Sequence, residues 1–154
     1  MQTDLNPGDK APDFSVTDHR GNKLSLDSLR GKKTVLYFYP KDNTPGCTAE
    51  ACSLRDGYEE LSEKGFVVIG VSPDTDKSHA GFSSKHNLPF HLVADTGKDL
   101  LKSYGAWGEK KMFGKIVEGV KRTTFIIDED GRIEHVIGKV DTKNHSGQIL
   151  ELYK

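Results

Sequence analysis

Short runs of β-branched and aromatic residues recur along this chain and alternate with polar segments. The first run is Thr34–Tyr39, which Pro40 closes, and the second is Phe66–Val71. A shorter run follows at His91–Ala94. Each run has the length and composition of a buried β-strand. The pattern therefore predicts three buried strands in the earlier part of the chain.

A helical period begins after the first run. The apolar positions of this segment are spaced as one stripe along a helix, which predicts a single amphipathic helix through all of them. They are Ala51, Leu54, Tyr58 and Leu61. Three further helices are predicted over residues 76–86, 98–104 and 143–153.

Turn signals mark two hairpins. Residues 122–128 and 132–137 flank the pair Asp130-Gly131, and Asp-Gly is a strong hairpin signal. Near the N-terminus, residues 14–16 and 23–25 flank a polar turn and predict a smaller hairpin. Strands and helices that alternate first and end in an antiparallel hairpin indicate an α/β fold with a mixed sheet. The pattern does not determine the order of the strands.

The composition narrows the class of protein. A chain of 154 residues and 17.0 kDa has the size of one domain, so we expect a single domain over residues 1–154. The formal net charge is -1 and lysines are interleaved with acidic residues, which excludes the basic surface of a nucleic-acid-binding protein. Residues 1–5 contain no apolar run, and the longest apolar stretches are of strand length. We therefore expect a soluble cytoplasmic protein with no signal peptide and no membrane partner.

The chain has two cysteines, Cys47 and Cys52, five positions apart. A reducing compartment disfavours structural disulfides, which leaves a catalytic or redox role open. The count alone favours a plainer interpretation, because buried cysteine often serves as a small apolar residue. Whether these cysteines are catalytic or simply small buried residues therefore depends on the sequence around them.

Cys47 is predicted at the start of the helix that follows the first strand. Thr44 is a suitable N-cap residue, and Pro45 suits the first helical position. Cys47 then falls in the first turn, where unpaired N–H groups and the positive end of the helix dipole favour a thiolate, the nucleophilic form of cysteine. Open α/β sheets build their sites at such positions, beyond the carboxyl end of a central strand. A capped helix with a small buried residue would fit Thr44 and Pro45 equally well.

The spacing of the two cysteines restricts how they can react. In a regular helix, five positions give a rise of about 7.5 Å and a Cα separation of roughly 8.6 Å. A disulfide spans at most ~7 Å between Cα atoms, so the pair cannot bond within an intact helix. Either the two never bond, or the helix must unwind locally. Ser53, Asp56 and Gly57 are poor helix formers, which weakens the helix near its middle and favours unwinding.

The segment Thr44-Pro-Gly-Cys-Thr-Ala-Glu-Ala-Cys52, preceded by Phe38-Tyr-Pro40, resembles the active-site segment of peroxiredoxins. It is similar to the bacterioferritin-comigratory, or peroxiredoxin Q, subfamily. The similarity extends over nearly the whole chain. Further matching segments, in the same order, are Gly8–Phe14, Gly70–Asp74, Tyr104–Lys111 and Arg122–Asp128.

This resemblance implies a fold and a reaction. The fold would be thioredoxin-like, with a mixed central sheet flanked by helices and an N-terminal β-hairpin extension. The reaction would be the reduction of hydrogen peroxide and organic hydroperoxides by Cys47, which becomes a sulfenic acid. Cys52 would resolve this acid as an intrachain redox-active disulfide, which thioredoxin reduces. The subfamily further implies a monomeric antioxidant enzyme without a cofactor or a metal.

The resemblance also assigns roles to four other positions. Arg122 would stabilise the Cys47 thiolate and the charge that develops on the peroxide oxygens, and Glu50 would hold Arg122 in place. The Thr44 hydroxyl and N–H groups of the first helical turn would orient the peroxide, and Pro40 would restrict water access. The residues alone leave two alternatives open. Arg122 can belong to a surface salt bridge, and Glu50 can be a first-turn acid that matches the helix dipole.

Three other functions compete for the same residues. A thioredoxin-like disulfide reductase needs Cys-x-x-Cys, whereas the spacing here is Cys-x-x-x-x-Cys. A non-enzymatic redox sensor or chaperone would use the same pair of cysteines as a switch. A Cys–His hydrolase requires a histidine in a recognisable pattern, and the sequence contains no such pattern.

Two further signals do not predict a site. The six histidines lack metal-ligand spacing, so we expect them in solvated or capping positions. Residues 108–115 resemble a phosphate-binding loop but have one residue too many, and Ile116 stands where serine or threonine is required. We expect a solvated loop there, whose Trp107 and Phe113 flank the active site or a partner surface.

Overall fold

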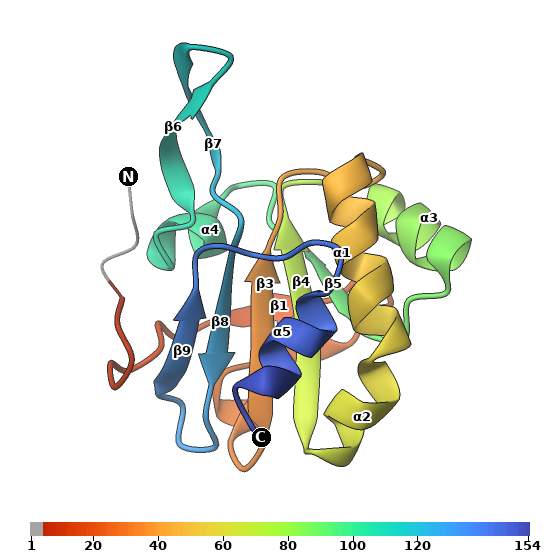
Figure 1. Cartoon of the computed structure of the whole chain (residues 1–154), viewed down its shortest axis with the longest axis vertical. Helices are drawn as coiled ribbons and strands as arrows, with labels where there is room; N and C mark the ends of the chain where they lie inside the picture. The colour runs from red at the N-terminus through yellow and green to blue at the C-terminus, as the bar shows by residue number, and fades with distance from the viewer. Residues whose placement is uncertain (1–4) are drawn as a thin grey trace.

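A computed structural model of the chain describes residues 5–154 and places a five-stranded sheet at its centre (Figure 1). From edge to edge the strands are β5 (His91–Ala94), β4 (Phe66–Ser72), β3 (Lys33–Phe38), β8 (Thr123–Ile127) and β9 (Ile133–Ile137). Strands β3, β4 and β5 are parallel, whereas β8 runs antiparallel to β3 and β9 runs antiparallel to β8. The predicted mixed sheet is confirmed. Residues 1–4 lie outside the described residues. The expectation that the N-terminus carries no signal peptide falls partly on these residues.

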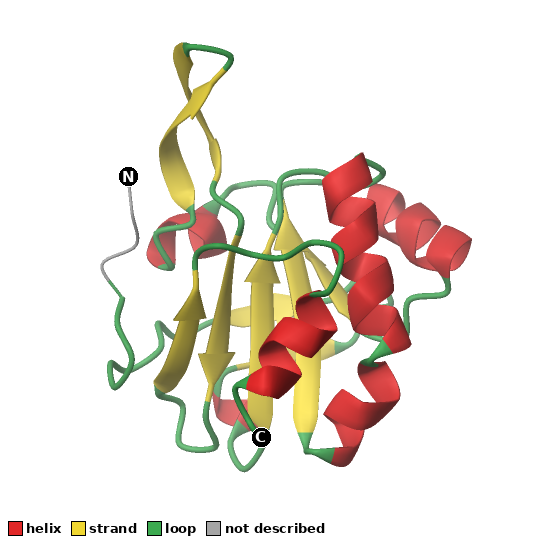
Figure 2. Cartoon of the chain, viewed as in Figure 1, coloured by secondary structure: helices red, strands yellow, loops and turns green. Residues whose placement is uncertain are grey.

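Helices and a small hairpin cover the two faces of the sheet (Figure 2). They are α1 (Pro45–Asp56), α2 (Tyr58–Glu63), α3 (Asp76–His86), α4 (Asp99–Ser103), α5 (His145–Glu151), the 3-10 helix η1 (Asp27–Leu29) and the hairpin strands β1 (Ser15–Thr17) and β2 (Lys23–Ser25). Helices α1, α2 and α5 lie on one face, and α4 lies on the other with the predicted N-terminal hairpin. Within residues 5–154, every helix is too short or too polar to cross a membrane.

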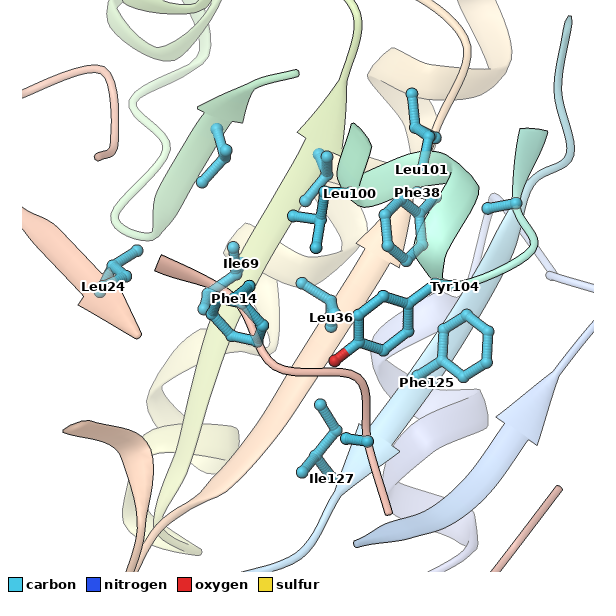
Figure 3. Close-up of a cluster of buried hydrophobic side chains, with 14 of the residues drawn as sticks. Phe14, Leu24, Leu36, Phe38, Ile69, Leu100, Leu101, Tyr104, Phe125 and Ile127 are labelled. Atoms are coloured by element: carbon cyan, nitrogen blue, oxygen red, sulfur yellow. The ribbon is translucent and has the colours of Figure 1, made fainter. Parts of the chain in front are cut away.

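Alternate residues of β3 enter two separate hydrophobic clusters, one on each face of the sheet. Leu36 and Phe38 belong to the cluster drawn in Figure 3, whereas Val35 and Tyr37 pack on the opposite face. Tyr104 also enters the first cluster, with its ring centroid 5.6 Å from that of Phe38. Burial on both faces explains why β3 has a continuous apolar run in the sequence rather than an alternating one.

The predicted long amphipathic helix is in fact two helices, which corrects the sequence prediction. Helix α1 ends at Asp56 and α2 begins at Tyr58, with Gly57 between them. A Cβ atom at Gly57 would lie 2.5 Å from Cβ of Ser146 on α5, so glycine allows α5 to pack against this junction. The break thus accommodates a tertiary contact, which the local apolar stripe does not encode.

Residues 107–120 form a hairpin where we expected a solvated loop. Strands β6 (Trp107–Met112) and β7 (Lys115–Val120) form a two-stranded sheet of their own, which projects from the body of the molecule (Figure 1). Phe113 and Gly114 make the turn with φ angles of 53° and 77°, the positive values of a two-residue hairpin turn. Since most of β6 and β7 is not buried, the sequence carries little apolar alternation there.

The two aromatic residues of this hairpin lie at opposite ends. Trp107 is partly buried against the first cluster, and the Lys98 Nζ lies 4.9 Å from the centroid of its ring. Phe113 is 97% exposed at the tip. Trp107 therefore anchors the base of the hairpin, whereas the Phe113 side chain faces solvent.

Several predicted boundaries shift by one or two residues. The strand predicted over 122–128 is β8, which begins at Thr123, so Arg122 directly precedes it. The helix predicted over 143–153 is α5, which begins at His145. The first shift bears on the site, because it places Arg122 just before the start of β8 rather than within the strand.

We predict that Gly57→Ala destabilises the protein by about 1–3 kcal/mol, because the added Cβ would overlap Ser146. Urea unfolding followed by circular dichroism measures the change. Gly81→Ala on α3 is the matched control, since apart from its chain neighbours and the backbone of its own helix, no described atom lies within 4 Å of the added Cβ. Helix propensity should stabilise that variant by up to about 1 kcal/mol. Equal effects of the two substitutions would contradict the packing role of Gly57.

Candidate active site

Strand β3 leads the chain to the start of α1, and Cys47 lies in the first turn of that helix. Thr44 has the extended backbone of an N-cap residue, with φ -85° and ψ 153°, and Pro45 begins the helix. Cys47 is 1% exposed and belongs to the same hydrophobic cluster as Tyr37. Both cysteines are free thiols. The structure thus places Cys47 in the first helical turn, where the sequence predicts it.

Arg122 reaches Cys47 from the neighbouring strand. β8 pairs with β3 so that Thr123 lies opposite Phe38, which puts Arg122 at the carboxyl end of β3, where the chain leads to α1. Its Nη2 donates a hydrogen bond to Cys47 Sγ at 3.2 Å. A guanidinium group at this distance can stabilise a thiolate both by its charge and by the hydrogen bond. The geometry thus differs from that of a surface salt bridge, the alternative that the residues alone left open.

Gly46 makes room for this guanidinium group, which the sequence pattern did not predict. A Cβ atom at position 46 would lie 3.2 Å from Arg122 Nη2. Any larger side chain would therefore push against the group that contacts Cys47. The signal that could have shown this is the glycine itself, because glycine is unfavourable within a helix and needs a local reason.

Glu50 binds the other branch of the Arg122 guanidinium group. Arg122 Nη1 donates to Glu50 Oε1 at 2.5 Å, and the Glu50 side chain is fully buried. Burial raises the pKa of Glu50 to about 7, although the charge and hydrogen bond of Arg122 oppose this rise. Its second oxygen, Oε2, has no hydrogen-bond partner among the described residues. Glu50 is therefore a buried partner of Arg122 and not a solvated first-turn acid.

His145 is fully buried beside Glu50, although we expected solvated or capping histidines. Its Nε2 lies 3.6 Å from Glu50 Oε2 and 2.8 Å from Thr124 Oγ1. Its Nδ1 lies 2.9 Å from Gln148 Oε1. Burial lowers the pKa of His145 to about 4, so the ring is neutral at pH 7. Because Gln148 Oε1 can only accept, the proton resides on Nδ1, and the ring has no proton to donate to Glu50.

Thr44 and Pro40 lie in the segment that leads to Cys47. The Thr44 hydroxyl donates to the Lys41 carbonyl at 2.8 Å and does not cap the helix. Its lone pairs can still accept a further hydrogen bond. Pro40 is partly buried and directly follows the buried Tyr39. The N-cap prediction is therefore right for the backbone of Thr44 and wrong for its side chain.

A buried polar cluster, which the sequence pattern did not predict, holds this segment in place. Asp42 Oδ1 accepts from the Tyr39 hydroxyl at 2.6 Å, and Asp42 Oδ2 lies 2.8 Å from His79 Nδ1. The Asp42 N–H donates to Asp74 Oδ2 at 2.8 Å. Burial alone would raise the pKa of Asp42, but the hydrogen bonds from His79 and Tyr39 outweigh it and lower that pKa.

The same cluster has the residue types of a metal site. Ligand atoms of Asp42, Asp74 and His79 lie within 4.8 Å of one another. Each of these side chains already forms hydrogen bonds: Asp74 Oδ2 also accepts from the Ser72 hydroxyl at 2.7 Å, and His79 Nε2 lies 3.1 Å from the Val93 carbonyl oxygen. These bonds make the cluster a support for the segment before Cys47 rather than an open coordination site.

Cys52 lies in the same unbroken helix as Cys47, as the spacing predicted. It is partly exposed, and its Sγ lies 3.8 Å from Nδ1 of His86, the last residue of α3. Gly57, expected to weaken the helix near its middle, instead lies beyond its end. The point where the helix is interrupted therefore lies after both cysteines and not between them. Their sulfurs can bond only if the first turns of α1 unwind.

We predict that Glu50 makes the stability of the reduced protein fall as the pH rises from about 4.5 to about 7. Folding raises the pKa of this carboxyl group from 4.5 to about 7, so the folded state binds its proton more tightly. The stability from this group is fully present below the lower value and is lost as the pH rises through the higher one. The loss is about 2–3 kcal/mol.

Urea unfolding at pH 5 and at pH 7.5 measures this loss when wild type is compared with Glu50→Gln, which cannot titrate. The difference between the two proteins isolates Glu50 from the other ionisable groups. If that difference is the same at both pH values, burial does not raise the pKa of Glu50.

Comparison with known proteins identifies the family. The model of the AhpC/TSA family matches residues 7–136. The chain is 48% identical over 143 residues to a putative peroxiredoxin Bcp of Coxiella burnetii, covering 93% of this chain and 95% of that protein. It is 46% identical over 147 residues to peroxiredoxin Bcp of Bacillus subtilis, covering 96% and 94% of the two chains.

A solved structure shows the same architecture. The bacterioferritin comigratory protein of Xanthomonas campestris, described for its alkyl peroxide reduction activity, matches with a TM-score of 0.86. It is 32% identical, and the match covers 98% of this chain and 96% of that one. Such neighbours are peroxiredoxins of thioredoxin-like fold, which confirms the predicted fold class. This chain therefore belongs to the AhpC/TSA family, and within it to the Bcp, or peroxiredoxin Q, peroxidases.

Proposed function

We propose that this protein reduces hydroperoxides with Cys47 and completes its cycle through a disulfide with Cys52. The observation that carries the proposal is the position of Arg122 Nη2, 3.2 Å from the sulfur of a buried Cys47 at a helix start. A cation and first-turn N–H groups around one sulfur favour the thiolate, which is the form that attacks a peroxide. Membership in a family of peroxidases supports the same chemistry.

In the first step, the Cys47 thiolate attacks one oxygen of the hydroperoxide and the O–O bond breaks. The sulfur keeps that oxygen as a sulfenic acid, and the other oxygen takes a proton and leaves as water or an alcohol. Negative charge moves from the sulfur to the leaving oxygen. Arg122 stabilises this charge, because Glu50 holds its planar guanidinium group beside the reacting atoms.

Thr44 and the first turn of α1 supply the remaining contacts of the peroxide in this proposal. The Thr44 hydroxyl donates to Lys41, so it can accept a hydrogen bond from the peroxide O–H. First-turn N–H groups such as those of Gly46 and Cys47 lack partners within a helix and can donate to a peroxide oxygen. Pro40 limits the access of water, since it is partly buried and has no N–H group.

Oxidation weakens the contact that holds Cys47 in place. A neutral sulfenic acid no longer forms the charge-assisted bond that a thiolate forms with Arg122. The first turns of α1 then unwind, and Cys52 attacks the Cys47 sulfur. A disulfide forms, and the oxygen leaves as water.

An external dithiol protein, which we propose is thioredoxin, reduces this disulfide by exchange. The substrates are hydrogen peroxide and organic hydroperoxides, in line with the alkyl peroxide reduction named for the Xanthomonas campestris protein. The cycle would serve antioxidant defence. A single domain, a monomeric state and a cytoplasmic location stay predictions from the sequence.

We predict that the reduced protein loses two hydrogens within seconds of mixing with one equivalent of hydrogen peroxide, because the disulfide forms. Intact mass spectrometry measures this change. Cys52→Ser should stop at a single added oxygen on Cys47, since no second thiol resolves the sulfenic acid. Cys47→Ser should consume peroxide no faster than buffer does.

Two results would contradict this proposal. One is full peroxide turnover by Cys47→Ser, which would remove Cys47 from the mechanism. The other is the absence of sustained peroxide consumption with thioredoxin, thioredoxin reductase and NADPH. In that case the cysteine pair would act as a redox sensor and not in a thioredoxin-coupled peroxidase.

We predict that Arg122→Met slows the oxidation of Cys47 by on the order of 10²–10³-fold, because the developing charge loses its cation. Arg122→Lys should recover part of the rate, since lysine keeps the charge but not the planar fork. Rapid-quench mass spectrometry of the oxygen adduct in a Cys52→Ser background measures the rate. Arg30→Gln is the control, because the Arg30 side chain is 63% exposed, and it should react like wild type. An unchanged rate in Arg122→Met would show that Arg122 does not act on the reacting atoms.

A further inference from the structure

The contact between Cys52 and His86 has no role in the cycle described so far. Cys52 Sγ on α1 lies 3.8 Å from His86 Nδ1 at the end of α3, within hydrogen-bonding range for sulfur. In the cycle, Cys52 must attack as a thiolate, because a thiol is a poor nucleophile. Some group therefore has to take the Cys52 proton when the sulfenic acid is resolved.

We propose that His86 is the general base that takes the proton from the Cys52 thiol during disulfide formation, an inference that rests on the proposed function. The proton moves from Cys52 Sγ to His86 Nδ1, and the resulting thiolate attacks the Cys47 sulfur. The S–S bond forms as the S–O bond of the sulfenic acid breaks. The departing hydroxide takes a proton and leaves as water, so one sulfenic acid and one thiol give one disulfide and one water.

The end of α3 suits a histidine that becomes charged. His86 is in the last turn of this helix, where carbonyl groups and the negative end of the helix dipole stabilise a cation. The Phe82 and His86 rings pack edge to face, with centroids 5.2 Å apart and planes at 73°. This contact fixes the imidazole ring beside Cys52 and leaves it partly exposed to solvent.

The half of α1 that carries Cys52 is tied to its neighbours. Arg55 Nη1 donates to the His86 carbonyl at 2.9 Å, which links α1 directly to the end of α3. Ser53 Oγ accepts from the Ser146 N–H at 3.2 Å, which links α1 to α5. Leu54 between them is fully buried. When the first turns of α1 unwind, Cys52 therefore stays beside His86, and Cys47 moves toward it.

The other charged groups near Cys52 have different roles. Arg55 interacts electrostatically with Cys52 and can stabilise its thiolate, but arginine cannot accept a proton. Asp56 is paired with Arg55, with Asp56 Oδ1 2.9 Å from Arg55 Nε. Lys85, also in the last turn of α3, is exposed. Of these groups and His86, the histidine combines contact with the Cys52 sulfur and a ring nitrogen that can accept a proton.

Single-turnover kinetics separates the two chemical steps and tests this role. Reduced protein is mixed with one equivalent of hydrogen peroxide, quenched in acid at increasing times, and weighed intact. In His86→Gln, the oxygen adduct should form at the wild-type rate and then accumulate, because disulfide formation slows by on the order of 10²-fold at pH 7. At pH 9.5, where solvent ionises an ordinary thiol, the variant and wild type should converge.

The design distinguishes a proton acceptor from a structural residue. Glutamine keeps the backbone carbonyl that Arg55 binds, so the link between α1 and α3 remains. Lys85→Gln removes a titratable group from the same helical turn without touching Cys52 and should behave like wild type. Disulfide formation at the wild-type rate in His86→Gln, or slowing by the same factor at both pH values, would overturn the role of His86. A wild-type protein that takes up no oxygen would instead overturn the proposed function itself.

Discussion

The ion pair between Arg122 and Glu50 is the constraint on which the rest of this site depends. An ionised carboxylate without solvent contact needs a charged partner. Arg122 supplies it with one nitrogen, while its other nitrogen reaches Cys47. The pair joins α1 to the start of β8, so the register of β8 against β3 determines where the cation lies. Gly46 leaves the space for it. His145 also lies beside Glu50, but it is neutral, so the charged partner of Glu50 in this pair of contacts is Arg122.

Helix α1 is held unequally along its length. Its later turns are attached to α3 and α5 through Arg55 and Ser53. They lead directly into Gly57, where the absence of a side chain lets Ser146 of α5 pack against the junction with α2. Its first two turns contact Arg122 through the sulfur of Cys47 and the carboxylate of Glu50, so one arginine binds both. Local opening of a protein follows such differences in attachment. A change of charge at one sulfur therefore acts on the least anchored part of the helix.

Local sequence signals predicted the elements whose residues are buried in a regular pattern. Strand β3 and the apolar stripe of α1 belong to this class, and so does the position of Cys47 at a helix start. The β6–β7 hairpin was missed because few of its residues are buried, so no apolar alternation marks it. The break at Gly57 was missed because its cause, Ser146, lies far away in the sequence.

The buried histidines show the same limit at the site. His79 and His145 were expected to be solvated or capping, yet each is fully buried with partners from distant segments. An isolated polar residue does not belong to a periodic pattern of apolar positions, so its burial and its contacts cannot be read from the sequence pattern. The position of Arg122 relative to Cys47 and Glu50 likewise depends on the pairing of β3 with β8, and the pattern of the sequence left the strand order undetermined.

The burial of Cys47 gives the proposed cycle a direction. Because only 1% of the Cys47 residue is exposed, a protein thiol cannot reach its sulfur in the folded reduced protein. A protein reductant can reach it only after the helix has opened to form the disulfide. In the proposed cycle, the folded reduced state is thus closed to the reductant, and the disulfide state lacks the arrangement of Cys47 and Arg122 that would attack peroxide. In this cycle, the folded and unwound states of the first turns of α1 would therefore determine whether the oxidant or the reductant can react with Cys47.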